Sequence, residues 1–218
     1  LFRGERVGSI GKNGIGKSTL LKILVNKLKQ DSGTVEYGSR VKVGYYDQNH
    51  MDLTPANNIL QEINNSLNLT EEYLRTLAGA FLFSGDDVLK KVEKLSGGEK
   101  VRVSFLKLYM QRANFLILDE PTSGLDFNNM TIISDIIKKL AKDKAIILIS
   151  HDYELLSRVV DRVIFLENGK ITEDFILKEK NQTKKDVNEK DSIGLISLFC
   201  GYSSKRRRFR SASFMQGR

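Results

Sequence analysis

Two spacings of apolar residues alternate along the first part of the chain. The short run Arg6–Ile10 shows a strand-like alternation and stops at a glycine-rich segment, and Ser18 to Leu28 follow helical spacing. This pattern predicts a strand, a loop and a helix. Residues 34–37 and 41–45 alternate again around the turn Gly38-Ser39-Arg40, which predicts a hairpin.

The middle of the chain has a mostly helical pattern. It runs from about Asn57 to Lys94, with breaks at Asn64-Asn65 and Ser84–Asp87, and resumes from Glu99 to Gln111. We therefore predict an inserted helical subdomain at about residues 50–112. No period of 20 to 50 residues repeats along the chain.

Apolar strands and helices alternate after the helical subdomain. The strands are Phe115–Leu118 and Ala145–Ile149, with a helical pattern from Met130 to Leu140 between them. Such alternation predicts an α/β fold with a mainly parallel sheet covered by helices on both faces. A further strand after Asp161 ends at the turn Asn168-Gly169, which predicts a small antiparallel β hairpin.

Composition changes this picture only at the end of the chain. Residues 178–218 begin with a polar run of mixed charge that cannot bury a core, so we expect a disordered tail there and one domain at residues 1–177. The net charge is +8, and the last eighteen residues supply +6 of it. We expect this basic end to be solvated, with binding to RNA or anionic lipid as the alternative.

The single cysteine, Cys200, cannot form an internal disulfide, which favours a reducing compartment. The longest apolar stretch near the tail, Ile193–Cys200, is shorter than the roughly 18 residues that a membrane span needs. We predict a cytoplasmic protein.

The glycine-rich segment after the first strand carries the first chemical motif. Gly11–Ser18 matches G-x-x-x-x-G-K-[ST] between a strand and a helix, the context in which that pattern binds a nucleotide triphosphate. Glycines let backbone N–H groups crowd around the phosphates, and the helix N-terminus adds partial positive charge. The predicted nucleotide-binding residues are Gly11, Asn13, Gly14, Gly16, Lys17, Ser18 and Thr19. The segment therefore predicts ATP binding on a P-loop NTPase core.

Two carboxylates close the next strand. Asp119 and Glu120 follow Phe115–Leu118 and therefore stand at the carboxyl edge of the sheet, where open α/β folds bind ligands. We predict that Asp119 and Ser18 hold Mg²⁺ and that Glu120 orients and polarises the attacking water.

Four further motifs complete an order that resembles ABC-type ATPase domains over residues 1 to 177. They are Gln48, the phrase Leu95-Ser96-Gly97-Gly98-Glu99-Lys100, the phrase Ser123-Gly124-Leu125-Asp126, and Ser150-His151-Asp152. In order along the chain they look like the Q-loop, the signature, the D-loop and the H-switch, and Asp119-Glu120 before the D-loop look like Walker B.

The resemblance implies a mechanism that is shared between two domains. Ser96, Gly97, Gly98 and Glu99 would contact the ATP held by an opposite cassette, and Asp126 would communicate across the pair. Gln48 would contact Mg²⁺ and the water, and His151 would hold the γ-phosphate and help position Glu120. The implied activity is hydrolysis of ATP to ADP and phosphate by a head-to-tail pair. The family also implies strands before Leu1, one of which carries an aromatic residue that stacks on adenine.

Two branches of the family share features with the chain. Gly44–Gln48, Phe81–Val88 and the short spacing from Lys17 to Leu95 resemble the second cassette of ABC-F proteins, which are soluble translation factors acting on the ribosome. Pro121–Asp126 and the residues after it look more like an importer ATPase, whose partners are transmembrane transporter subunits. We favour ABC-F. A third alternative is a module that binds ATP without hydrolysing it, against which Lys17, Asp119, Glu120 and His151 argue.

Overall fold

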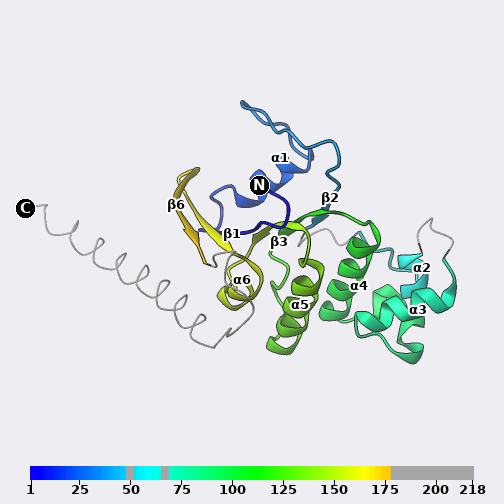
Figure 1. Cartoon of the computed structure of the whole chain (residues 1–218). Helices are drawn as coiled ribbons and strands as arrows, with labels where there is room; N and C mark the ends of the chain where they lie inside the picture. Colours follow the sequence, from blue (N-terminus) through cyan, green and yellow to red (C-terminus); the bar gives the residue numbers. More distant parts are fainter. Residues whose placement is uncertain (48–51, 65–68, 178–218) are drawn as a thin grey trace, which may run out of the picture. The chain divides into compact units, whose positions relative to one another are not determined.

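The computed structural model describes residues 1–47, 52–64 and 69–177. Residues Leu1–Leu177 form one compact unit, built around a six-stranded sheet in the order β2-β3-β4-β1-β5-β6 (Figure 1). The strands are β1 Arg6–Gly11, β2 Val43–Tyr46, β3 Phe115–Asp119, β4 Ala145–Ile149, β5 Arg162–Glu167 and β6 Lys170–Ile176. The strands from β2 to β5 pair in parallel, and β6 pairs antiparallel with β5. The predicted fold class is therefore confirmed.

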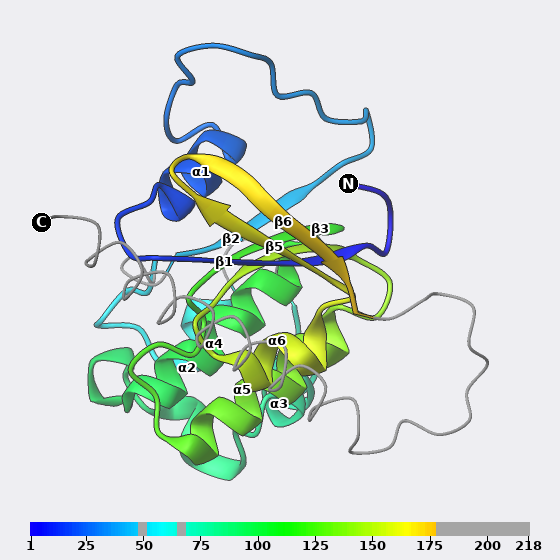
Figure 2. The same ribbon diagram turned by 90° about the vertical axis from the view of Figure 1, so that its left-hand side faces the viewer.

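Helices cover both faces of the sheet. Helix α1 (Lys17–Leu24) lies on one face, and α4 (Gly97–Met110), α5 (Phe127–Leu140) and α6 (Tyr153–Val159) lie on the other, as Figure 2 shows. Strands β3 and β4 are buried along almost their whole length. That burial explains why both strands read as continuous apolar runs.

Short helices form the segment between β2 and α4. They are α2 (Ile59–Ile63), α3 (Glu71–Ala80) and two 3₁₀ turns, Gly85–Leu89 and Val92–Lys94. Asn58 caps α2 by accepting a hydrogen bond from the Gln61 backbone N–H at 2.8 Å. The buried carboxylate of Glu62 pairs with Lys107 of α4 at 2.5 Å, which ties α2 to α4.

The hairpin predicted at residues 34–45 is wrong. Residues 34–42 form no strand, and β2 runs parallel to β3 with Val43 opposite Phe115. Alternating polarity cannot distinguish a hairpin from a short strand inside a parallel sheet, and a two-stranded hairpin alone is only marginally stable. Burial decides the outcome, because Tyr46 stacks on Phe105 of α4 with ring centroids 5.0 Å apart. The antiparallel hairpin of the fold is the one predicted around Asn168-Gly169.

Two helices have boundaries that differ from the prediction. Helix α1 ends at Leu24 instead of Leu28, because the chain turns into a left-handed conformation at Asn26 (φ 57°). Helix α5 begins at Phe127 instead of Met130, because the Asp126 side chain accepts a hydrogen bond from the Asn129 backbone N–H at 3.0 Å.

Ion pairs close the amino ends of β1 and β5 and the carboxyl end of the antiparallel strand β6. The Arg6 guanidinium donates two hydrogen bonds to Asp161, at 2.8 and 2.6 Å. The Arg162 guanidinium donates to Glu5 at 2.9 Å and to Asp174. Arg6 and Arg162 therefore each have a carboxylate partner.

No helix in the described part of the chain is both long enough and apolar enough to cross a membrane.

Candidate functional site

The loop between β1 and α1 has the backbone geometry of a phosphate cradle. Gly16 precedes α1 with φ 99°, a left-handed conformation that side chains other than glycine rarely adopt. Helix α1 begins at the next residue, Lys17, so the free N–H groups of its first turn point toward the loop. These donors and the helix dipole favour an anion at this position.

Lys17 is buried inside the loop although it carries a charge. Only 7% of the residue is exposed, and its ammonium donates hydrogen bonds to the carbonyl oxygens of Gly11 at 2.7 Å and Lys12 at 3.0 Å. Burial lowers the pKa of Lys17, and the nearby carboxylates of Glu120 and Asp119 act in the opposite direction. The ammonium is thus held by neutral carbonyl groups and can exchange them for phosphate oxygens.

The two carboxylates at the end of β3 have different environments. Asp119 is 4% exposed, and one of its oxygens, Oδ1, is buried without a hydrogen-bond partner in the described structure. Burial raises the pKa of Asp119, although a hydrogen bond from the Ser18 hydroxyl works against this rise. Glu120 has φ 47°, an uncommon conformation for a side chain other than glycine. Such strain is found at functional sites, where surrounding contacts hold the residue in place.

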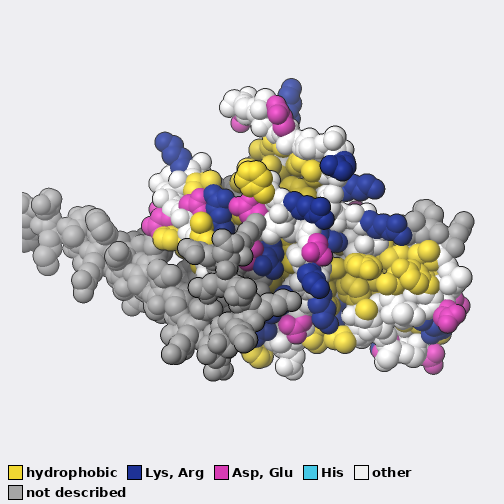
Figure 3. All heavy atoms as spheres, in the orientation of Figure 1, with side chains coloured by type: hydrophobic (Ala, Val, Ile, Leu, Met, Phe, Trp, Pro, Cys, Tyr) yellow, Lys and Arg dark blue, Asp and Glu magenta, His cyan; other side chains and the backbone are white. Residues whose placement is uncertain are grey.

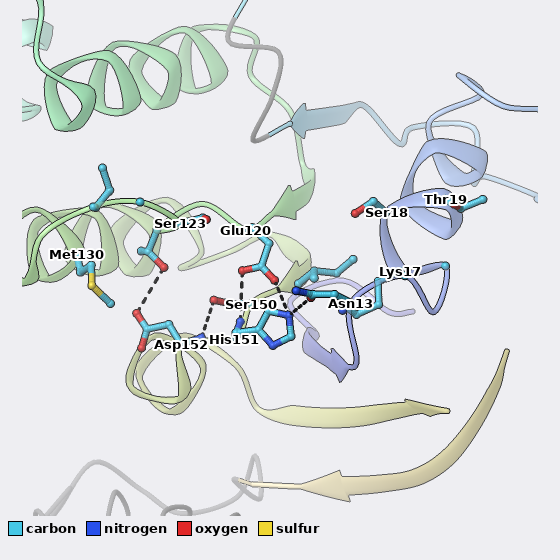
Figure 4. A pocket seen from close by; sticks show the side chains of 16 residues that line it. Asn13, Lys17, Ser18, Thr19, Glu120, Ser123, Met130, Ser150, His151 and Asp152 are labelled. Atoms are coloured by element: carbon cyan, nitrogen blue, oxygen red, sulfur yellow. Dashed lines mark hydrogen bonds and ion pairs between the residues drawn. The ribbon is translucent and has the colours of Figure 1, made fainter. Parts of the chain in front are cut away.

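His151 stands after β4 and connects three parts of the site. Its Nε2 lies 2.8 Å from Oδ1 of Asn13 in the phosphate loop and 3.4 Å from Oε1 of Glu120. The backbone N–H of His151 also donates to Oε2 of Glu120 at 3.3 Å. Figure 4 shows Glu120 and Asn13 on two sides of the imidazole ring.

These elements surround a cavity of about 720 Å³, which is large enough for a nucleotide. Its walls come from the phosphate loop, the loop after β3, the first turns of α5, and the end of β4 (Figure 4). Of the predicted residues, it is lined by Asn13, Gly14, Gly16, Lys17, Ser18, Thr19, Glu120 and His151. Gly11 and Asp119 lie directly behind this wall, through their contacts with Lys17 and Ser18.

The predicted signature residues do not line the cavity. Ser96 caps α4 by accepting a hydrogen bond from the Glu99 backbone N–H at 3.2 Å. The Glu99 carboxylate accepts in return from the Ser96 backbone N–H at 2.8 Å, so the pair forms a capping box. The first turn of an α-helix leaves backbone N–H groups without a partner inside the helix, so the start of α4 can receive a ligand held elsewhere.

Asn129 joins the signature to the loop of Asp126. Its side-chain amide donates to Oδ2 of Asp126 at 2.6 Å. A Cβ added to Gly98 would lie only 2.2 Å from Oδ1 of Asn129, so the Gly98 backbone packs directly on that amide. Hydrogen bonds from the Asn129 backbone and side chain also lower the pKa of Asp126.

Sequence reasoning did not assign several cavity residues to the site, although it quoted some of them within the D-loop and H-switch phrases. The cavity is also lined by Thr122, Ser123, Gly124, Leu125, Met130, Ile149, Ser150 and Asp152. The hydroxyl of Thr122 donates to Asp152 at 3.4 Å and thereby joins the loops after β3 and β4. The phrase Ser150-His151-Asp152 signals part of this set, but no local pattern signals Asn129. Gln48, predicted as a catalytic and metal-contacting residue, lies outside the described residues.

The residues beside the phosphate loop fit a divalent cation. The unpartnered Oδ1 of Asp119 supplies a hard oxygen ligand next to the hydroxyl of Ser18. No cluster of three or more His, Cys, Asp or Glu metal ligands occurs among the residues that the structure describes. Mg²⁺ commonly binds through one or two protein oxygens together with substrate phosphates, which matches this ligand set.

The chain is similar to a known protein family and to several proteins named as ATP-binding. A family model described as "ABC transporter" matches residues 1–123. The chain is 47% identical over 174 residues to the putative ATP-binding protein YdiF of Bacillus subtilis, covering 79% of this chain and 27% of the relative. It is 40% identical over 166 residues to the probable ATP-binding protein YbiT of Escherichia coli, covering 74% and 31%.

Another relative is the ATP-binding protein Uup of Buchnera aphidicola, 35% identical over 190 residues, with coverage of 82% of this chain and 32% of the relative. The chain thus spans about a third of these relatives or less. The fold is similar to that of a dimeric ATP-binding cassette, MJ0796, in a post-hydrolysis state bound to ADP and phosphate. That match has a TM-score of 0.68 and 24% identity, and it covers 82% of this chain and 88% of the other.

Proposed function

This chain belongs to the ABC transporter family, as its sequence motifs predicted, and we propose that it hydrolyses ATP when it pairs head to tail with a second cassette. The chain has the fold of an ABC ATP-binding cassette, which is an ATPase fold. The observation that carries the proposal is the meeting of Glu120 and His151, 3.4 Å apart, in the cavity lined by the phosphate loop.

The phosphate loop binds the triphosphate. The Lys17 ammonium leaves the carbonyls of Gly11 and Lys12 for β- and γ-phosphate oxygens, which makes stronger, charge-assisted hydrogen bonds. Asn13, Gly14, Gly16 and Thr19 surround the phosphates with backbone and side-chain donors. Ser18, Asp119 and Gln48 would hold Mg²⁺, which neutralises the charge of the phosphates when it is bound.

Glu120 orients and polarises the attacking water. Its carboxylate is fixed by the backbone N–H and the ring of His151, at 3.3 and 3.4 Å, and by an unusual backbone conformation. A fixed carboxylate at the cavity wall is the geometry that a general base requires. His151 also reaches Asn13, and exchange of that partner for the γ-phosphate places the ring between substrate and base.

One chain supplies two half-sites. Ser96, Gly97, Gly98 and Glu99 lie outside the chain's own cavity, and the N-terminus of α4 suits a phosphate held by another cassette. Asp126 would communicate across that pair. Two similar solved structures carry titles that describe them as dimeric, which supports pairing with a second cassette.

Within the family, we place the chain in an ABC-F protein that acts on the ribosome. The short spacing from Lys17 to Leu95 supports this assignment, as do the relatives Uup, YbiT and YdiF, all named ATP-binding proteins. The alternative is the ATP-binding subunit of an importer, with transmembrane subunits as partners. Sedimentation of the complete protein carrying Glu120→Gln separates the two, since a protein trapped with ATP on ribosomes supports ABC-F and recovery in membranes alone contradicts it.

A pair of substitutions tests the shared ATPase site. Glu120→Gln should retain MgATP binding but slow phosphate release about 10²- to 10⁴-fold, the usual contribution of a positioned base. It should also accumulate ATP-dependent dimers in size-exclusion chromatography. Adding Ser96→Arg should abolish those dimers by placing bulk and charge against the phosphate.

The matched control is Glu154→Gln, which makes the same chemical change at an exposed residue of α6. It should hydrolyse ATP at the rate of the unmodified chain. Normal turnover in Glu120→Gln removes Glu120 from the role of base. Monomers with ATP in both variants contradict the head-to-tail pair.

A further inference from the structure

The amino ends of β2, β3 and β4 form a second edge of the sheet, opposite the nucleotide cavity. Asn114 ties three segments together there. Its side chain accepts a hydrogen bond from the Lys42 N–H at 2.8 Å and donates one to the Arg40 carbonyl at 2.8 Å, and its carbonyl accepts from the Ala145 N–H at 3.1 Å. Neighbouring strands lie about 4.8 Å apart, so the three strand ends span about 10 Å.

Cations are concentrated at this edge. Residues 40–42, 112–114 and 142–144 contain five of them, Arg40, Lys42, Arg112, Lys142 and Lys144, and a single acid, Asp143. We call these five side chains the basic edge. All but Lys144 are exposed, and no ion pair between described residues includes any of the five.

The other half of the same edge is neutralised. At the amino ends of β1 and β5 and the carboxyl end of β6, Arg6 pairs with Asp161, and Arg162 pairs with Glu5 and Asp174. In Figure 3 Lys and Arg side chains gather across the middle of the visible face, where Figure 1 places the start of β2 and the ends of α4 and α5. The positive charge is therefore local and not a property of the whole edge.

Two partly exposed tyrosines stand beside the cations. Tyr109 of α4 is 42% exposed, and the Lys144 ammonium lies 5.9 Å from its ring centroid. Tyr37 is 36% exposed, and its ring lies 6.4 Å from that of Phe115 at the start of β3. Aromatic rings among cations can stack on unpaired bases whose phosphates the cations neutralise.

We propose that the basic edge, with Tyr37 and Tyr109, binds the phosphates and bases of single-stranded nucleic acid. At roughly 3.4 Å of rise per nucleotide, a 10 Å edge contacts about three nucleotides. The proposal goes beyond ATP hydrolysis and does not depend on it, because the edge lies at the opposite ends of the strands from the phosphate loop. Anionic lipid is the competing ligand, and the test below separates it from RNA.

The test measures binding of a fluorescein-labelled oligouridylate to the nucleotide-free full chain by fluorescence anisotropy at several salt concentrations. In the triple variant Lys42→Gln/Arg112→Gln/Lys144→Gln, affinity should fall at least about tenfold at low salt. The slope of log affinity against log salt should become shallower by about 2, because each lost phosphate contact contributes about 0.7. Tyr109→Leu should weaken binding about tenfold with little change of slope.

The matched control, Lys91→Gln/Lys94→Gln/Lys170→Gln, removes the same charge from exposed positions away from the edge and should bind RNA as the unmodified chain does. A second variant replaces the six basic residues of 201–218 by glutamine. If this variant abolishes binding and the edge variant leaves affinity and slope unchanged, the proposal is overturned. Binding to phosphatidylserine vesicles that depends on the edge, without RNA binding, also overturns it. Unchanged melting temperatures and ATP hydrolysis in the edge variant exclude a folding defect and keep this test separate from the proposed ATPase activity.

Discussion

The two ends of the central strands handle charge in opposite ways. At the carboxyl end, Lys17 is 7% exposed and donates to two carbonyl oxygens. Asp119 is 4% exposed, and its Oδ1 has no hydrogen-bond partner among the described residues. At the amino end of β1 and β5, Arg6 and Asp161 satisfy each other with two hydrogen bonds at 2.8 and 2.6 Å. The first arrangement leaves interactions available for a ligand, and the second uses them for the fold.

This contrast teaches how to distinguish a functional charge from a structural one. Removal of a charge that already has its partner should cost folding free energy and leave ligand binding intact. Removal of a buried charge that has no opposite charge as its partner should weaken ligand binding and cost little folding free energy. Three substitutions test this difference, from the largest expected effect to the smallest.

Lys17→Ala should give the largest effect. It removes charge-assisted hydrogen bonds to two phosphates, so the dissociation constant for MgATP should rise about 10²-fold or more. Folding stability should change little, because among the described residues the ammonium donates to two carbonyl oxygens and has no ion pair with a carboxylate. Titration calorimetry with MgATP measures the dissociation constant, and thermal unfolding measures the stability.

An exposed lysine outside the phosphate loop supplies the control, since Lys29→Ala should alter neither quantity. An unchanged dissociation constant in Lys17→Ala would remove the phosphate loop from nucleotide binding. A clear fall in melting temperature would instead place Lys17 among the structural charges.

Asp161→Ala should have the opposite profile. It leaves the Arg6 guanidinium without its bidentate partner, which should lower the free energy of unfolding by about 2 kcal/mol. Nucleotide affinity should stay the same, because Asp161 lies at the other end of the strands. Urea unfolding of this variant beside the exposed control Asp31→Ala measures the loss. Unchanged stability, or weakened ATP binding, contradicts the contrast between the two ends.

Asp119→Asn should give the smallest effect on stability and one that depends on pH. Burial raises the pKa of Asp119, so its ionised form costs stability once the pH rises above the unfolded value of about 3.9. The substitution should therefore raise the melting temperature at pH 7, on the order of 2 °C. Near pH 3, where both states hold the proton, the gain should disappear. A variant that is less stable than the original chain at pH 7 would show that Asp119 stabilises the fold.

Local patterns were sufficient for most of the fold. The glycine-rich loop, the apolar strands β3 and β4, and the turn at Asn168-Gly169 each carry their signal within a few neighbouring residues. The cavity follows from the same logic, because the loops that line it come directly after β1, β3 and β4. A parallel sheet brings such loops together at one edge.

Contacts between residues far apart in the sequence could not be predicted from local patterns. The alternation at residues 34–45 fits both a hairpin and the parallel strand β2, and only the contact of Tyr46 with Phe105 decides between them. The pair Arg6–Asp161 joins residues 155 positions apart. The basic edge likewise appears only when three separate segments meet at Asn114.

The side-chain amide of Asn129 connects the loop of Asp126 to the start of α4. It holds the carboxylate of Asp126 at 2.6 Å on one side and supports the Gly98 backbone on the other, with no room for even a methyl group between them. Close-packed contacts of this kind transmit displacement instead of absorbing it. A displacement of the loop of Asp126 should therefore move the start of α4 with it. The loop of Asp126 and the start of α4 should thus move together, because both contact the side chain of Asn129.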